Sequence, residues 1–295
     1  MTEHYRDMFA PELDYGDAPM GIEDVQLIGN WAFRIGVERN APAEFKKRVV
    51  AAAVSYNLGY AGVDYLLKLY GDGWIVPDPG KDTAGLIYQM TSSVKTSVRA
   101  ASERVRLISA ELDHNGRFLA RAALLRLQLT FRASVLTIHN GFHYESAALT
   151  RIILEQLAWI NTIHLLPDQS ALSVKPTKCL AELKKMHPHV GRLYGVLCTL
   201  THMDPETLGD YVNKVDSSLV KPDQLPELLA VDALRLLLVG DVYVCLTEIV
   251  FAEDLGSFIH TCRNEKESRL PSPDRPLLGT IQRYADQAGI AVEWR

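Results

Sequence analysis

Apolar residues recur at spacings of three and four along most of the chain, which is the periodicity of amphipathic helices. No clear hairpin signal accompanies this pattern, because helical patterns flank the Asn140-Gly141 pair, which therefore predicts a turn between two helices. We predict an all-α, multi-helix bundle. Its helices are expected at about 22–40, 43–70, 82–114, 117–139, 143–165, 177–186, 190–202, 226–252 and 277–288.

Proline and glycine mark the expected boundaries between parts of the chain. No proline lies between Pro79 and Pro167, whereas GDGWIVPDPG at 71–80 interrupts the helical pattern. We expect an acidic N-terminal arm (1–20), an N-terminal helical pair (21–70), a main helical bundle (81–255), and a linker with a short C-terminal helix (256–295).

Composition and charge narrow the classes of function. Of the 295 residues, 47% are hydrophobic and 23% charged, which excludes a mainly disordered chain. The net charge of −5 argues against a generally basic nucleic-acid binder but permits a local basic surface.

The cellular compartment is predicted from the first 24 residues and from the apolar segment 226–251. The first 24 residues hold seven acids and one arginine, unlike a secretory or transit peptide. The apolar segment 226–251 contains Asp232, Arg235, Asp241 and Glu248, which is typical of a core helix rather than a membrane span. We therefore expect a cytoplasmic protein without membrane contact, and free, buried thiols at Cys179, Cys198, Cys245 and Cys262.

Metal and cofactor signatures are weak. His139 and His143 lie four positions apart, but Asn140-Gly141 is expected to separate them. A di-iron bundle needs two E-x-x-H motifs, and only Glu111 with His114 supplies one. We expect no metal and no other cofactor.

A basic stripe follows the predicted helix 117–139. No acid lies between His114 and Tyr144, and Arg117, Arg121, Arg132 and His139 fall within about 60° of one another on a helical wheel. Three interpretations stay open. The stripe pairs with acidic residues of the same chain, of which 204–254 holds eleven against three basic residues; or it is a solvated face; or it binds a phosphate-bearing ligand, RNA included. Under the last interpretation the phosphate-binding residues are Arg117, Arg121 and Arg132.

The predicted helix 143–165 is apolar on nearly all sides, which predicts burial. Between Glu145 and Asp168 its only formal charges are Arg151 and Glu155, which can meet at i, i+4. Desolvation makes a buried ion pair a poor source of net stability. The pair either fixes the packing of the helix or lines an internal cleft.

A resemblance covers about residues 130–215. HNGFHYESAALTRIILEQLAWI followed by GRLYGVLCTLTHMDP resembles uncharacterised bacterial all-helical families with an R-x-x-x-E helix and a following Y-x-x-L-[ST]-x-x-H helix. The matching residues here are Arg151, Glu155, Tyr194 and His202, although the spacing between the last two departs from the pattern. These families resemble HEPN-type domains, which act in abortive infection, toxin–antitoxin systems and phage defence.

The resemblance implies a HEPN-like core, a homo-oligomer, and binding or cleavage of RNA without a metal. HEPN ribonucleases use an R-x(4–6)-H motif, whose spacing Arg132 and His139 match, with Ala133 where a polar residue is common. His202 brought near Arg151 by folding is the other arrangement. In either, histidine would transfer a proton and arginine would neutralise charge on phosphate. The candidate catalytic residues are Arg151, Glu155, His202, His139 and Arg132.

Two other functions remain open. The chain is alternatively a non-catalytic helical interaction protein, whose Arg–Glu pair and basic stripe are structural or face a protein partner. An enzyme acting on a small molecule in the internal cleft is the third possibility.

Overall fold

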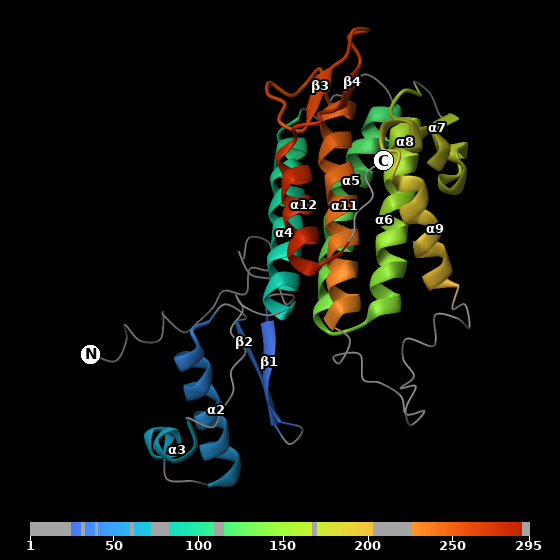
Figure 1. Cartoon of the computed structure of the whole chain (residues 1–295). Helices are drawn as coiled ribbons and strands as arrows, with labels where there is room; N and C mark the ends of the chain where they lie inside the picture. Colours follow the sequence, from blue (N-terminus) through green and yellow to red (C-terminus); the bar gives the residue numbers. More distant parts are fainter. Residues whose placement is uncertain are drawn as a thin grey trace. The chain divides into compact units, whose positions relative to one another are not determined.

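The computed structural model describes residues 25–30, 33–38, 41–59, 62–71, 83–108, 115–166, 170–202 and 226–290. The chain divides into two compact units, residues 1–78 and 79–295, and the boundary falls inside the glycine- and proline-rich segment 71–80. The expected acidic arm, 1–20, lies outside the described residues. The elements of each unit are drawn in Figure 1.

The first unit begins with a hairpin rather than a helix. Strands β1 (Val25–Asn30) and β2 (Phe33–Glu38) pair in antiparallel register, with Val25 opposite Glu38 and Asn30 opposite Phe33. The helix predicted at 22–40 is therefore wrong. Residues 33–38, FRIGVE, alternate apolar and polar positions with the period of two that a strand requires.

Two helices complete this unit, α2 (Ala43–Leu58) and α3 (Val63–Tyr70). The single helix predicted at 43–70 is interrupted because Gly59 adopts φ +68°, a left-handed conformation that ends helices and suits glycine. The N-terminal helical pair therefore lies within 43–70, where one helix was expected, and a β-hairpin takes the place of the other expected helix.

The second unit confirms the all-α bundle. Four long helices, α4, α5, α6 and α11, pack side by side, with α12 against α4 and α11, and α8 and α9 against α6 (Figure 1). The bounds are α4 (Thr83–Leu107), α5 (Asn115–His139), α6 (His143–Ile163), α7 (Ser170–Ser173), η3 (Pro176–Lys178), α8 (Leu180–Met186), α9 (Val190–Thr201), α11 (Pro226–Val250) and α12 (Pro276–Ala288).

The turn between α5 and α6 occurs where Asn140-Gly141 predicts it. Gly141 adopts φ +79°, and the Asn140 side chain donates to the Leu136 carbonyl at 2.8 Å, which satisfies an acceptor at the end of α5. The prediction of a helix-to-helix turn is confirmed.

Helix α11 lies at the centre of the bundle and is buried over most of its length. Its three buried acidic residues all have basic partners: Asp232 meets His143 and Arg235, Asp241 meets Arg275, and Glu248 meets Arg104. These partners compensate the desolvation of the carboxylates. Within the described ranges, no helix combines the length and apolar composition needed to cross a bilayer.

The segment expected as a linker contains a second small hairpin. Strands β3 (Thr261–Arg263) and β4 (Arg269–Pro271) pair in antiparallel register. Glu248 of α11 anchors the start of β3, because its carboxylate accepts hydrogen bonds from the backbone N–H groups of residues 259, 260 and 261 at 2.9–3.0 Å. The hairpin leads into α12, whose Leu277 and Ile281 belong to the core.

All four cysteines are free thiols. Cys179 and Cys245 are buried, Cys198 is half-buried and Cys262 is exposed. The expected free state is confirmed, whereas the expected burial holds only for the first two.

Candidate functional site

The Arg151–Glu155 pair forms on α6 as the i, i+4 spacing predicts. Arg151 Nε donates to Glu155 Oε1 at 3.0 Å, and the two side chains retain 23% and 18% exposure. The pair is therefore half-buried rather than enclosed in the core. It lies on the side of α6 that faces α9.

Helix α9 completes a polar cluster around this pair. Arg151 Nη1 donates to Thr201 Oγ1 at 2.8 Å, and the Tyr194 hydroxyl donates to Glu155 Oε1 at 2.9 Å. The Arg151 guanidinium also lies 5.7 Å from the centre of the Tyr194 ring, within the range of a cation–π contact. We call Arg151, Glu155, Tyr194 and Thr201 the Arg151 cluster.

Two members of the Arg151 cluster, Tyr194 and Arg151, have raised pKa values. Partial burial raises the pKa of Tyr194 to about 12, and its bonds to Glu155 and Cys198 act in the same direction. Partial burial by itself lowers the pKa of Arg151, but the hydrogen bond and charge of Glu155, with Cys198 and Tyr194, outweigh it and raise the pKa. The cluster thus presents a permanent cation beside a protonated phenol.

His202 lies at the same end of α9 as Thr201. Its backbone N–H donates to the Cys198 carbonyl at 3.0 Å, and its side chain is exposed. Among the described residues its imidazole makes no hydrogen bond or ring contact with the Arg151 cluster. The fold therefore brings Arg151 into contact with Thr201, the residue before His202, while the His202 ring is exposed to solvent.

Arg132 and His139 are not part of this cluster. Arg132 is exposed on α5. His139 Nε2 lies 2.9 Å from Thr91 Oγ1 of α4, and its ring stacks on Tyr88 with centroids 6.2 Å apart. These contacts hold His139 at the α4–α5 interface.

The arginines of the basic stripe on α5 contact different parts of the chain. Arg117 is buried, and its guanidinium bonds to Asp254 and, at 3.4 Å, to Glu253. Arg121 donates to the carbonyls of Val105 and Arg106 at 3.3 Å each, which caps the C-terminal end of α4. Both contacts agree with the intramolecular interpretation of the stripe.

A buried polar network connects α6 to α11. His143 Nδ1 lies 2.6 Å from Asp232 Oδ2, which also accepts from Ser146 at 2.9 Å, while Arg235 donates to Oδ1 at 2.9 Å. His143 and Asp232 are both almost completely buried, so the network positions helices rather than reaching a ligand. Its partners are 89 residues apart, and no local pattern indicated the pairing.

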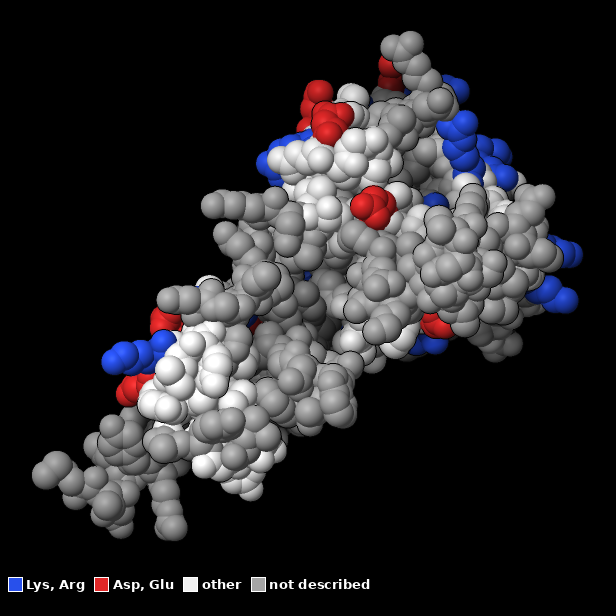
Figure 2. Space-filling model, turned by 60° about the horizontal axis from the view of Figure 1, so that its bottom comes forward, with Lys and Arg blue, Asp and Glu red and all other residues white. Residues whose placement is uncertain are grey.

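Sequence reasoning also missed a basic surface beside α9. Between residues 175 and 192, from the start of η3 into α9, five exposed basic residues occur with a single acid, Glu182; they are Lys175, Lys178, Lys184, Lys185 and Arg192. In Figure 2, Lys and Arg side chains gather along the right-hand edge of the bundle, on the side where Figure 1 places α8 and α9. We call these five residues the α8–α9 basic surface. The charge imbalance over 175–192 is visible in the sequence and was the available signal.

Metal-ligating groups do not gather in the part of the chain that the structure describes, where no three His, Cys, Asp or Glu residues are placed to hold an ion. His139 and His143 bond to different helices, α4 and α11. The Glu111–His114 motif falls outside the described ranges.

Comparison with family models, with curated proteins and with solved structures finds no significant match to this chain.

Proposed function

We propose that this protein is a HEPN-like RNA-binding protein that cleaves RNA at the Arg151 cluster and His202. The observation that supports this best is the 2.8 Å hydrogen bond from Arg151 to Thr201, because it ties the cation of α6 to the residue that precedes His202. The α8–α9 basic surface supplies the sequence-independent attraction for a phosphate backbone.

The chemistry divides between the histidine and the arginine. The His202 imidazole takes the proton of a ribose 2′-hydroxyl, whose oxygen attacks the adjacent phosphorus. The new bond joins O2′ to phosphorus, the bond to the 5′ oxygen breaks, and that leaving oxygen takes a proton from water. Arg151, with its permanent charge, neutralises the oxygens of the phosphorane. The products are a 2′,3′-cyclic phosphate and a 5′-hydroxyl.

The decisive experiment incubates the purified chain with end-labelled single-stranded RNA in the presence of EDTA. We expect fragments ending in 2′,3′-cyclic phosphate, lost in His202→Ala. Arg151→Lys keeps the charge but not the planar fork, and should reduce the rate at least about tenfold. His139→Ala is the matched control, since His139 is held at the α4–α5 interface.

Three outcomes would contradict this assignment. Cleavage that survives His202→Ala but disappears in His139→Ala would transfer the activity to the Arg132–His139 pair. Binding that is insensitive to Lys184→Glu with Lys185→Glu would remove the α8–α9 basic surface from the proposal. The absence of both cleavage and RNA binding would reject the function.

A second candidate is a non-catalytic helical interaction protein. It is favoured by the internal engagement of the cations, since Arg151 bonds to Glu155 and Thr201, and Arg117 to Asp254. In that case Arg151→Ala lowers the melting temperature, His202→Ala does not, and neither variant affects RNA.

The proposal extends to a cytoplasmic homo-oligomer in a bacterial defence or toxin–antitoxin system. Light scattering after size-exclusion chromatography measures the oligomer. Expression of the chain and of His202→Ala in bacteria tests the toxicity that this role predicts. Loss of growth with both forms, or with neither, contradicts it.

A further inference from the structure

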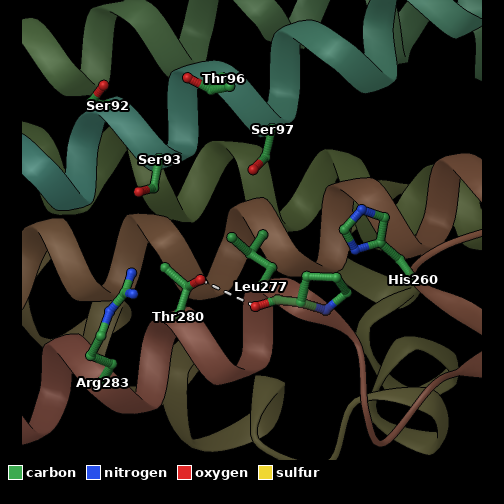
Figure 3. A pocket seen from close by; sticks show the side chains of 9 residues that line it. Ser92, Ser93, Thr96, Ser97, His260, Leu277, Thr280 and Arg283 are labelled. Atoms are coloured by element: carbon green, nitrogen blue, oxygen red, sulfur yellow. Dashed lines mark hydrogen bonds between the residues drawn. The ribbon is translucent and has the colours of Figure 1, made fainter.

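A cavity of about 300 Å³ opens between α4 and α12, near the start of β3 (Figure 3). Its volume is at the lower end of the range of ligand pockets, about 300–1,000 Å³. Figure 1 places α4 and α12 on the opposite side of α11 from α9, so the cavity is separate from the Arg151 cluster. The lining residues are Ser92, Ser93, Thr96, Ser97, His260, Pro276, Leu277, Thr280 and Arg283.

Four hydroxyl side chains of α4 are among the residues that line the cavity. Serine and threonine inside helices usually bond to a backbone carbonyl of the preceding turn, as Thr91 and Ser93 do at 2.9–3.0 Å. Ser92, Thr96 and Ser97 make no such bond to any described residue. Figure 3 shows Ser93 and Ser97 pointing toward α12, and Ser92 and Thr96 pointing away from it. The Ser93 hydroxyl lies 3.3 Å from the Tyr284 hydroxyl, so Ser97 is the lining hydroxyl of α4 that both faces α12 and has no partner among the described residues.

The opposite wall adds positive charge. Arg283 of α12 forms no ion pair with a described carboxylate, and its guanidinium lies 5.0 Å from the centre of the Tyr284 ring. Pro276, Leu277 and Thr280 also line the cavity, so it lies along one side of α12 over its first two turns. No acidic residue is among those that line the cavity.

His260 contributes an unsatisfied nitrogen. Its Nδ1 is buried and has no hydrogen-bond partner among the described residues. Burial lowers the pKa of His260, as do Arg104 and Arg275, while Glu248 and Asp241 act in the opposite direction. The ring is therefore neutral at pH 7 and offers a donor or an acceptor rather than a charge.

We propose that the α4–α12 cavity binds a small phosphate ester, with Arg283 on the phosphate and with Ser97 and His260 on the hydroxyl groups of the organic part. An arginine fork matches phosphate oxygens. The Ser97 hydroxyl and the unpartnered His260 Nδ1 can bond to sugar hydroxyls, and the volume admits a sugar phosphate.

Isothermal titration calorimetry on the full chain tests this with three probes: glucose 6-phosphate, glucose and inorganic phosphate. We expect saturable binding of glucose 6-phosphate, weaker binding of phosphate, and none of glucose. Arg283→Gln should weaken glucose 6-phosphate binding at least about tenfold. Ser97→Met, which fills the cavity from the hydroxyl wall, should abolish it.

Arg126→Gln is the matched control, because Arg126 is an exposed arginine of α5 that bonds to Gln156. It should bind like the parent chain. Circular dichroism of each variant checks that the helices remain. The proposal is overturned if glucose 6-phosphate does not bind, if glucose binds equally well, or if folded Arg283→Gln and Ser97→Met bind as the parent does.

Discussion

Glu248 is the carboxylate whose removal should cost the bundle most. It is almost completely buried at the C-terminal end of α11 and accepts five hydrogen bonds, from the backbone N–H groups of residues 259, 260 and 261, the Thr261 hydroxyl and Arg104. Glu248→Gln replaces one carboxylate oxygen by an NH₂ group, which cannot accept a hydrogen bond from the donors that surround it. The smaller loss occurs when this group takes the place of Oε1, because only the bonds from Ile259 and Arg104 are then lost.

The expected loss follows from the strength of bonds to a charged group, about 1.5–3 kcal/mol each. Two lost bonds, with weakening of the other three, give a decrease in the free energy of unfolding of about 4 kcal/mol. Burial raises the pKa of Glu248, but the bonds from Ile259, Thr261, Arg104 and His260 outweigh it and lower the pKa. The stabilisation is therefore present above the unfolded pKa of 4.5 and is lost as pH falls below it.

Urea denaturation followed by circular dichroism measures this difference at pH 7 and pH 4. The gap between parent and Glu248→Gln should be largest at pH 7 and narrow on acidification. Glu182→Gln removes an exposed carboxylate paired with Lys185, and should change stability by less than about 1 kcal/mol. A loss below about 1 kcal/mol in Glu248→Gln, or a gap that widens at low pH, would refute the reasoning.

Three further predictions concern burial and packing. Burial, with smaller effects of His189 and Arg275, lowers the pKa of His187 to about 3. Because the unfolded chain binds a proton at this residue below pH 6.5 and the folded chain does not, the free energy of unfolding decreases as the pH falls. Urea denaturation of His187→Leu should show a stability difference between pH 7 and pH 5 that is about 2 kcal/mol smaller than in the parent chain. Gly116→Ala should lower the melting temperature sharply, because the added methyl collides with two backbone carbonyls, whereas Gly195→Ala, with open space around it, should raise it slightly. Arg117→Met should cost about 2 kcal/mol in chemical denaturation, since it removes the buried partner of Asp254; an unchanged midpoint would show that this pair contributes nothing.

Local patterns predicted the helices of the second unit because helix formation depends on residues three and four apart. The turn at Asn140-Gly141 and the Arg151–Glu155 contact follow from the same short range. The hairpin of β1 and β2 was missed because short apolar runs suit helix and strand alike, and pairing between strands decides the outcome. The hairpin of β3 and β4 was missed because its polar sequence indicates only a loop, while a glutamate on another element anchors it.

For the candidate site, too, the sequence predicts contacts within one helix but not the contacts between helices. By itself the sequence determined that Arg151 and Glu155 share a helix face and that a basic stripe follows α5. Only the tertiary structure decided the partners of each charge: Thr201 for Arg151, 50 residues away, and Asp254 for Arg117, 137 residues away. Spacing within a helix fixes direction about its axis, but which helix lies on that side depends on how the whole bundle packs. A charge pattern therefore identifies a face, and the packed core determines what that face contacts.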